Sequence, residues 1–183
     1  MEENKSSVIK SAMSYGLLLG IFWLFKYVFF ILGYTISSNY LLFYQALAPV
    51  TLILAYIFTR RYRMDIGGRI QFFHAWQFGI LLYTFAGIIL SLEQFIFYRF
   101  LAPSDFIANS LQATLEMLEG TNLSPKMAET ITRMEVPTPI SMAIMGILNN
   151  TFYGIIFSIP VAALLCRNNA TGQIDENNHL ENE

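Results

Sequence analysis

The longest apolar run in the sequence places the strongest constraint on the fold. It covers residues 74–98, about 25 residues, and carries one full charge, Glu93. Since about 20 consecutive apolar residues can cross the hydrocarbon core of a bilayer, this run predicts a membrane-spanning helix. A carboxylate inside hydrocarbon is costly unless it is paired, hydrated or protonated, so Glu93 requires a partner or water.

The composition agrees with a membrane protein. Of the 183 residues, 55% are hydrophobic and 13% are charged. Soluble domains average about 45–50% apolar and about 25% charged residues. The length leaves room for one domain. We therefore expect a single domain whose surface faces lipid more than water.

Three further apolar runs cover residues 11–33, 40–59 and 140–165. Lys26 is the only full charge in the first run, and Pro49 lies near the middle of the second, where proline is expected to kink a helix. A signal peptide is the competing interpretation of the first run. Its apolar region would be shorter, about 7–15 residues, and would end in a small-residue cleavage site, which this run lacks. We therefore predict an all-α, integral membrane four-helix bundle over residues 11–166, with a leader at 1–10 and a disordered tail at 167–183.

The long connection at residues 99–139 predicts a short helical hairpin between the third and fourth spans. Ser104 is a candidate cap for a first helix that ends at Gly120, and Ser124 with Pro125 is a candidate start for a second. Each helix carries a narrow apolar stripe at helical spacing. The stripes consist of Ile107, Leu111, Leu115 and Leu118 in the first helix, and Met127, Ile131 and Met134 in the second.

The distribution of basic residues predicts the orientation. The leader, the loop between the second and third spans, and the start of the tail contain Lys5, Lys10, Arg60, Arg61, Arg63, Arg69 and Arg167. The connections on the other side contain only Arg99, Lys126 and Arg133, although they are longer. Because cytoplasmic loops carry the excess of Lys and Arg, both termini are predicted to be cytoplasmic, with the helical hairpin outside.

Lys26 and Glu93 form a candidate intramembrane ion pair. Each lies about six or seven residues from the predicted outer end of its span, roughly 10 Å deep at 1.5 Å per residue. Opposite charges at matching depth are suited to a structural ion pair or to a proton- or ion-responsive site. The alternative is that Lys26 extends its ammonium to the outer interface and that Glu93 lies near water.

Small residues recur at every fourth position in two of the spans. Such stripes let helix backbones approach closely, either within the bundle or between copies, so both are candidate helix-packing faces. Asn149 and Asn150 add amides that are suited to hydrogen bonding across helices. The candidate packing residues are Gly16 and Gly20 in the first span, and Gly146, Asn150, Gly154 and Ser158 in the fourth.

The sequence contains no recognisable catalytic constellation. A nucleophile elbow, a metal-binding HExxH pair and paired carboxylates are absent from the spans. One cysteine, Cys166, and two distant histidines, His74 and His179, argue against a metal site. We therefore expect no enzymatic activity, cofactor, metal or nucleic-acid partner. The first hypothesis is an accessory or assembly subunit that contacts lipid and a membrane-protein partner or a second copy. The alternative is a small oligomeric transporter or ion-coupled carrier that uses Glu93 and Lys26.

The chain resembles the DUF4199 family of small bacterial membrane proteins, found mainly in Bacteroidetes. Three segments carry the resemblance: YRMDIGGRIQFF at residues 62–73, GTNLSPKM at residues 120–127, and the Gly- and Ser-containing fourth span before Cys166 and Arg167. The resemblance implies four spans and a location in the bacterial inner membrane. The family has no known function, so it implies no active residues.

Overall fold

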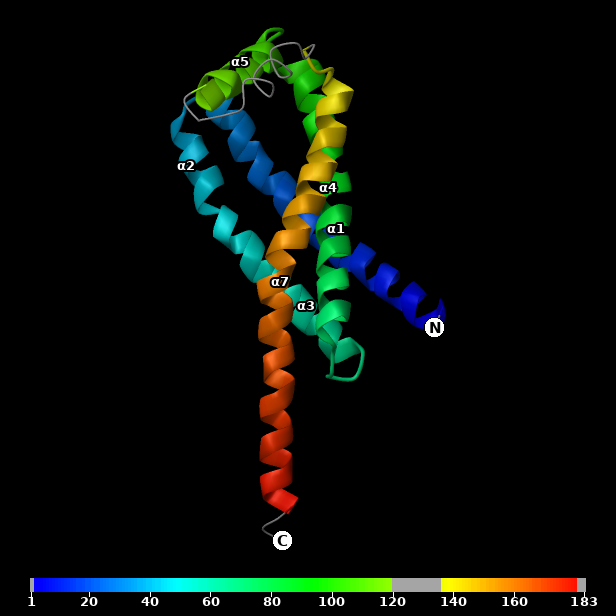
Figure 1. The fold of residues 1–183 in the computed structure, drawn as a ribbon. Coiled ribbons are helices and arrows are strands. Elements are labelled where there is room, and N and C mark those ends of the chain that lie inside the picture. The colour runs from blue at the N-terminus through cyan, green and yellow to red at the C-terminus, as the bar shows by residue number, and fades with distance from the viewer. Residues whose placement is uncertain (1, 120–135, 181–183) are drawn as a thin grey trace. The chain divides into compact units, whose positions relative to one another are not determined.

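The structure is a computed structural model that describes residues 2–119 and 136–180. Figure 1 shows its helices: α1 (Glu2–Thr35), α2 (Asn39–Ala46), α3 (Ala48–Asp65), α4 (Phe72–Ile96), the π-helical turn η1 (Phe97–Leu101), α5 (Phe106–Glu119) and α7 (Pro139–Leu180). The chain divides into two compact units. One comprises Met1–Leu90 with Gly146–Glu183, and the other comprises Ser91–Met145.

Four helical segments are long and apolar enough to cross a membrane: Ser7–Thr35, Asn39–Asp65, Phe72–Leu101 and Pro139–Arg167. No strand occurs in the described residues. The all-α class with four candidate spans is therefore confirmed. Each segment extends a few residues beyond the corresponding apolar run, because the helices continue into polar flanks such as the one that ends at Asp65.

The second span consists of two helices. The helical pattern is interrupted at Leu47, between α2 and α3, and Pro49 occupies the first turn of α3. Proline is tolerated at this position because the first amides of a helix have no partner within the helix. The sequence predicts a kink at Pro49, and the structure instead has a break between two helices at Leu47, two residues before the proline.

The turn after α3 depends on two glycines. Gly67 and Gly68 have φ values of +98° and +84°, a region that L side chains rarely adopt. The amide of Gly68 donates to the carbonyl of Arg63 at 2.9 Å, and the amide of Gly67 donates to the carbonyl of Met64 at 3.2 Å. These bonds satisfy carbonyls that the end of a helix leaves without donors, and the chain can then turn into α4.

Helix α4 provides the packing centre of the first unit. Its buried side chains include Phe78, Leu82 and Ala86, each with an exposed fraction of 0%. Close contacts with α4 come from α1 on one side, through Gly16 and Gly20, and from α7, through Gly154 and Ser158. At each of these contacts a glycine on one of the two helices lets the backbones approach.

The second unit contains the end of α4, η1, α5 and the start of α7. At its wide turn the amide of Ala102 donates to the carbonyl of Phe97 at 2.8 Å, five residues back. α5 begins at Phe106, one residue later than a cap at Ser104 would place it, and the Ser104 hydroxyl donates to Asp105 Oδ1 at 3.5 Å. The predicted second arm of the hairpin, from Ser124 onward, and the expected stop at Gly120 lie outside the described residues. The hairpin as a whole stays a prediction.

Helix α7 is longer than the predicted fourth span. It continues as helix from Pro139 to Leu180, whereas the sequence predicts a disordered tail from residue 167. Pro160 lies inside this helix and leaves the carbonyl of Ile156 without its usual donor. The indole Nε1 of Trp76, on α4, donates to the adjacent carbonyl of Ile155 at 2.9 Å. The two helices are thus also joined through a main-chain carbonyl.

Candidate functional site

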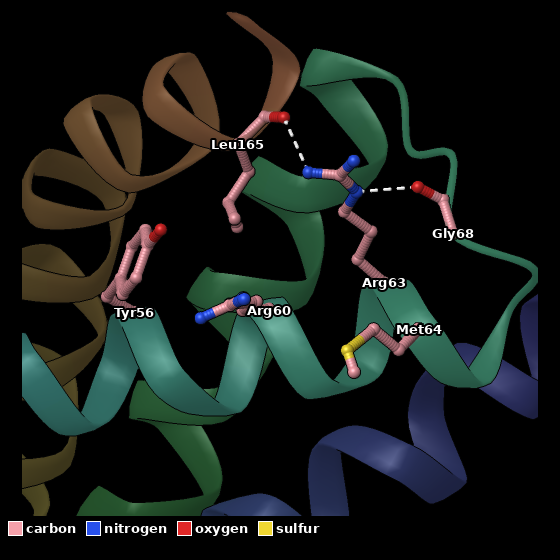
Figure 2. Close-up of a pocket in the computed structure, with 6 residues that line it drawn as sticks. All are labelled: Tyr56, Arg60, Arg63, Met64, Gly68 and Leu165. Atoms are coloured by element: carbon pink, nitrogen blue, oxygen red, sulfur yellow. Dashed lines mark hydrogen bonds between the residues drawn. The ribbon is translucent and has the colours of Figure 1, made fainter. Parts of the chain in front are cut away.

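A pocket of about 480 Å³ lies between the end of α3 and α7 in the first unit. Figure 2 shows its lining residues: Tyr56, Arg60, Arg63, Met64, Gly68 and Leu165. We refer to these six residues as the arginine pocket. Four of them lie on α3 at spacings of four, three and one residues, so helical geometry places them along one face. The wall opposite comes from α7 and from the turn after α3.

Arg63 connects three parts of the pocket. Its Nε donates to the carbonyl of Gly68 at 2.6 Å, and its Nη1 donates to the carbonyl of Leu165 at 3.1 Å (Figure 2). A guanidinium has five N–H donors, so these two bonds leave three N–H groups for a further acceptor. Because both bonds are to main-chain carbonyls, they fix the guanidinium without neutralising its charge.

Arg60 is the second cation of the pocket and has no such partners. Within the described part of the chain, its side chain makes no hydrogen bond and no ion pair. Figure 2 shows its guanidinium extended toward the side of the pocket formed by Tyr56. The nearest acid in sequence, Asp65, accepts a hydrogen bond from the Tyr15 hydroxyl of α1 at 2.8 Å. The arginine pocket therefore combines two positive charges with no carboxylate in its lining.

Lys26 and Glu93, the candidate ion pair, belong to different units, so their pairing stays a prediction. The described contact of Lys26 is a cation–π interaction, with Nζ 4.4 Å from the centroid of the Tyr44 ring. Cation–π contacts are worth about 0.5–2 kcal/mol, more where water is excluded. The phenol ring on α2 thus partly offsets the cost of placing the ammonium of α1 in an apolar environment.

Glu93 has a different environment. Its Oε2 atom is buried and has no hydrogen-bond partner among the described residues, and the same holds for Oε1 of the adjacent Gln94. Glu93 lies eight residues before the end of the third span at Leu101, about 12 Å at 1.5 Å per residue. An unpartnered carboxylate at that depth indicates either a missing partner or a proton.

The packing residues predicted from the small-residue stripes lie against α4. A Cβ added to Gly16 would be 2.7 Å from Phe85 Cβ, and one added to Gly154 would be 2.7 Å from Tyr83 Cβ. Gly20 faces Ile89, and a Cβ on Gly87 of α4 would be 3.0 Å from Asn150 Cβ. Residues of both stripes therefore pack on α4.

Two of the predicted residues in the fourth span also take part in close packing or hydrogen bonding. Ser158 occupies the space beside Gly79, and a Cβ on that glycine would meet its Oγ and Cβ atoms. Asn150 Nδ2 donates to the carbonyl of Gly146 at 2.8 Å, one helical turn earlier. Nearby, the hydroxyls of Thr84 and Thr151 lie 3.1 Å apart and join α4 to α7. The polar groups on this face are thus used inside the unit.

Asn149, which the sequence predicts to hydrogen-bond across helices together with Asn150, has a different environment from its neighbour. It lies on an exposed face of α7, next to Leu148, Phe152 and Tyr153, which have exposed fractions of 65%, 57% and 43%. Its side chain makes no hydrogen bond within the described residues. Its position ten residues after Pro139 corresponds to about 15 Å, near the middle of a hydrocarbon core of about 30 Å. Because Asn149 and Asn150 are adjacent, they cannot face the same side of the helix, which is why only Asn150 lies against α4.

The arginine pocket was not predicted from the sequence. Arg60 and Arg63 served there only as indicators of orientation, although Tyr56, Arg60 and Arg63 recur at helical spacing. Within residues 2–119 and 136–180, no three His, Cys, Asp or Glu side chains gather as a candidate metal site. His74 Nε2 lies 2.7 Å from the Tyr62 hydroxyl, and the Cys166 thiol donates to the carbonyl of Ile70 at 3.4 Å.

Comparison with known proteins places the chain in a family. The family model described as "Protein of unknown function (DUF4199)" matches residues 14–167. The match covers the second, third and fourth candidate spans in full and the first span from residue 14 onward. No curated protein and no solved structure matches the chain. The match extends over most of the 183 residues, and the chain therefore belongs to the DUF4199 family.

Proposed function

We propose that this protein is a non-enzymatic accessory or assembly subunit of the bacterial inner membrane, with both termini in the cytoplasm. Its role is to recognise a transmembrane helix of another membrane protein. The single observation that carries this proposal is the exposed amide of Asn149 on α7, flanked by Leu148 and Phe152. In hydrocarbon an amide without hydrogen bonds is costly, and a partner helix is the usual source of such bonds.

Two further features support a role in recognition. The exposed face of α7 is aromatic and aliphatic around Asn149, with Tyr153 and Ile156 exposed to 43% and 44%. The small residues of the opposite face are already used against α4, so the exposed face remains for a partner.

The proposed orientation, with both termini in the cytoplasm, is supported by the basic residues on both sides of the turn after α3.

Affinity purification after crosslinking tests this proposal. The tagged full-length chain is recovered from its native membranes in mild detergent, and the proteins that accompany it are identified by mass spectrometry. We expect a stoichiometric partner with the native chain and with Asn149→Gln, which keeps the amide. With Asn149→Leu the recovery should fall about three- to tenfold, as expected for loss of one interhelical hydrogen bond in a membrane. Equal recovery with Leu and Gln at this position would refute the role of the amide.

The alternative is a small oligomeric transporter or ion-coupled carrier that uses Glu93 and Lys26. The buried, unpartnered Oε2 of Glu93 favours it, because carriers place ionisable groups of this kind along their pathway. This alternative predicts that the same purification recovers only further copies of the chain. It also predicts that Glu93→Gln abolishes transport.

A further inference from the structure

The arginine pocket has the features of an anion-binding site. Arg60 and Arg63 both line it, no carboxylate does, and Arg63 is held in place by the carbonyls of Gly68 and Leu165. Guanidinium groups bind phosphate through paired N–H donors, more strongly than neutral hydrogen bonds allow. The unassigned donors of Arg63 and the unengaged guanidinium of Arg60 are suited to such a group.

The apolar surface next to the pocket identifies the kind of molecule that carries the anion. Ile53 and Ile57 precede Arg60 on α3 by seven and three residues, so helical spacing puts them on its face of the helix. Their exposed fractions are 57% and 39%. The side chains of Met64 and Leu165 add further apolar lining to the pocket. An apolar track thus leads from the arginines along the membrane-spanning part of α3, as an acyl chain requires.

The position of the pocket along the span agrees with a lipid ligand. Arg60 and Arg63 lie in the last two turns of the helical segment that ends at Asp65, at the border between the apolar span and the turn with Gly67 and Gly68. Phosphate groups of a bilayer occupy this border. Basic pockets between transmembrane helices at the cytoplasmic face are suited to anionic head groups.

We propose that the arginine pocket binds the phosphate head group of an anionic phospholipid, with Arg60 and Arg63 as its ligands and the acyl chains along Ile53 and Ile57. This inference is independent of the accessory role, because it concerns a different end of α7 from Asn149 and names a lipid rather than a protein. The bound lipid would connect α3 to α7 at the point where Arg63 already joins them.

Native mass spectrometry of the full-length protein in detergent tests the proposal. The probes are dioleoyl-phosphatidylglycerol, dioleoyl-phosphatidylcholine and inorganic phosphate, each at the same concentration. We expect specific binding of the anionic lipid and weaker binding of the zwitterionic one. Arg60→Gln should weaken binding of phosphatidylglycerol about tenfold, because it removes a charge-assisted interaction. Arg60→Lys, which keeps the charge but not the fork of donors, should weaken it less.

The matched control is Arg61→Gln, which removes the same charge one residue away at an exposed position outside the pocket. The Arg61→Gln variant should bind phosphatidylglycerol within about twofold of the native protein, because an exposed charge outside the pocket contributes little to binding. Equal losses from Arg60→Gln and Arg61→Gln would overturn the proposal in favour of general surface charge. Equal binding of phosphatidylglycerol and phosphatidylcholine would also overturn the proposal. Binding of inorganic phosphate with the same dependence on Arg60 would overturn the lipid as occupant. Far-ultraviolet circular dichroism shows whether each variant retains its helices.

Discussion

At the scale of single residues, a charge in an apolar run can be identified from sequence, but its interaction partner cannot, as Lys26 and Glu93 show. Both could be identified from sequence, because each is the only full charge in its run. Their partners could not be predicted, since hydropathy gives depth but not the direction of a side chain. The ring of Tyr44 lies 4.4 Å from Lys26 Nζ, whereas Glu93 Oε2 is buried without a hydrogen bond from the described residues.

Stability measurements on substitutions test whether the two charges interact. Glu93→Leu should destabilise the protein if it leaves Lys26 without its counter-charge, and Lys26→Met combined with Glu93→Leu should then restore much of the loss. Removing one member of a buried pair costs about 3–5 kcal/mol, while an apolar replacement of both is often neutral. The measurement is reversible unfolding in mixed micelles, with Tyr44→Leu as the control for the cation–π contact.

The ion pair would be ruled out by a double variant as unstable as Glu93→Leu alone. A strong coupling between Lys26→Met and Tyr44→Leu, with none to Glu93→Leu, would assign the ammonium to the aromatic ring instead. Two double-mutant cycles that share Lys26→Met, one with Glu93→Leu and one with Tyr44→Leu, give these two coupling energies.

At the scale of helices, the small-residue stripes predicted close contacts but did not identify the helix that makes them. A residue with a small side chain at every fourth position predicts a close contact, and Gly16, Gly20 and Gly154 all make one. The spacing does not say which helix fills the space. Gly79 and Gly87 of α4 both face α7, at Ser158 and Asn150. Helix α1 approaches α4 through its own Gly16 and Gly20, so both stripes pack against α4.

An exchange of size between α4 and α7 tests this packing. Gly79→Ala should destabilise the protein by about 1–3 kcal/mol, because its new methyl group overlaps the Cβ and Oγ of Ser158. Ser158→Gly removes both atoms and leaves only its Cα, 3.6 Å away, at ordinary contact distance. The double variant should therefore recover most of the loss in the free energy of unfolding.

The control for that exchange is Ser14→Ala, a small change at an exposed position of α1. Its effect should stay within about 0.5 kcal/mol. Purely additive effects of Gly79→Ala and Ser158→Gly would show that the two residues do not touch, and would remove the direct contact between α4 and α7 at this point.

At the scale of the whole molecule, hydropathy was sufficient for the all-α class and the four spans. Length and apolarity alone decide whether a helix can cross a bilayer, so neither depends on tertiary contacts. The arginine pocket needed the fold, since it forms only where α7 and the turn at Gly68 close over one face of α3. The continuation of α7 to Leu180 was not predicted, because the polar composition after residue 167 carries no helical periodicity of apolar residues.

The central claim is that the exposed face of α7 recognises another membrane protein. Photo-crosslinking in living cells tests it most directly, with a photoreactive amino acid in place of Phe152 on α7 or, as the control, Phe25 on α1. Their exposed fractions are nearly equal, 57% and 58%, so lipid alone would be captured at both positions. We expect a discrete adduct with one protein from position 152 and none from position 25. Adducts with lipid only, or the same protein adducts from both positions, would contradict it.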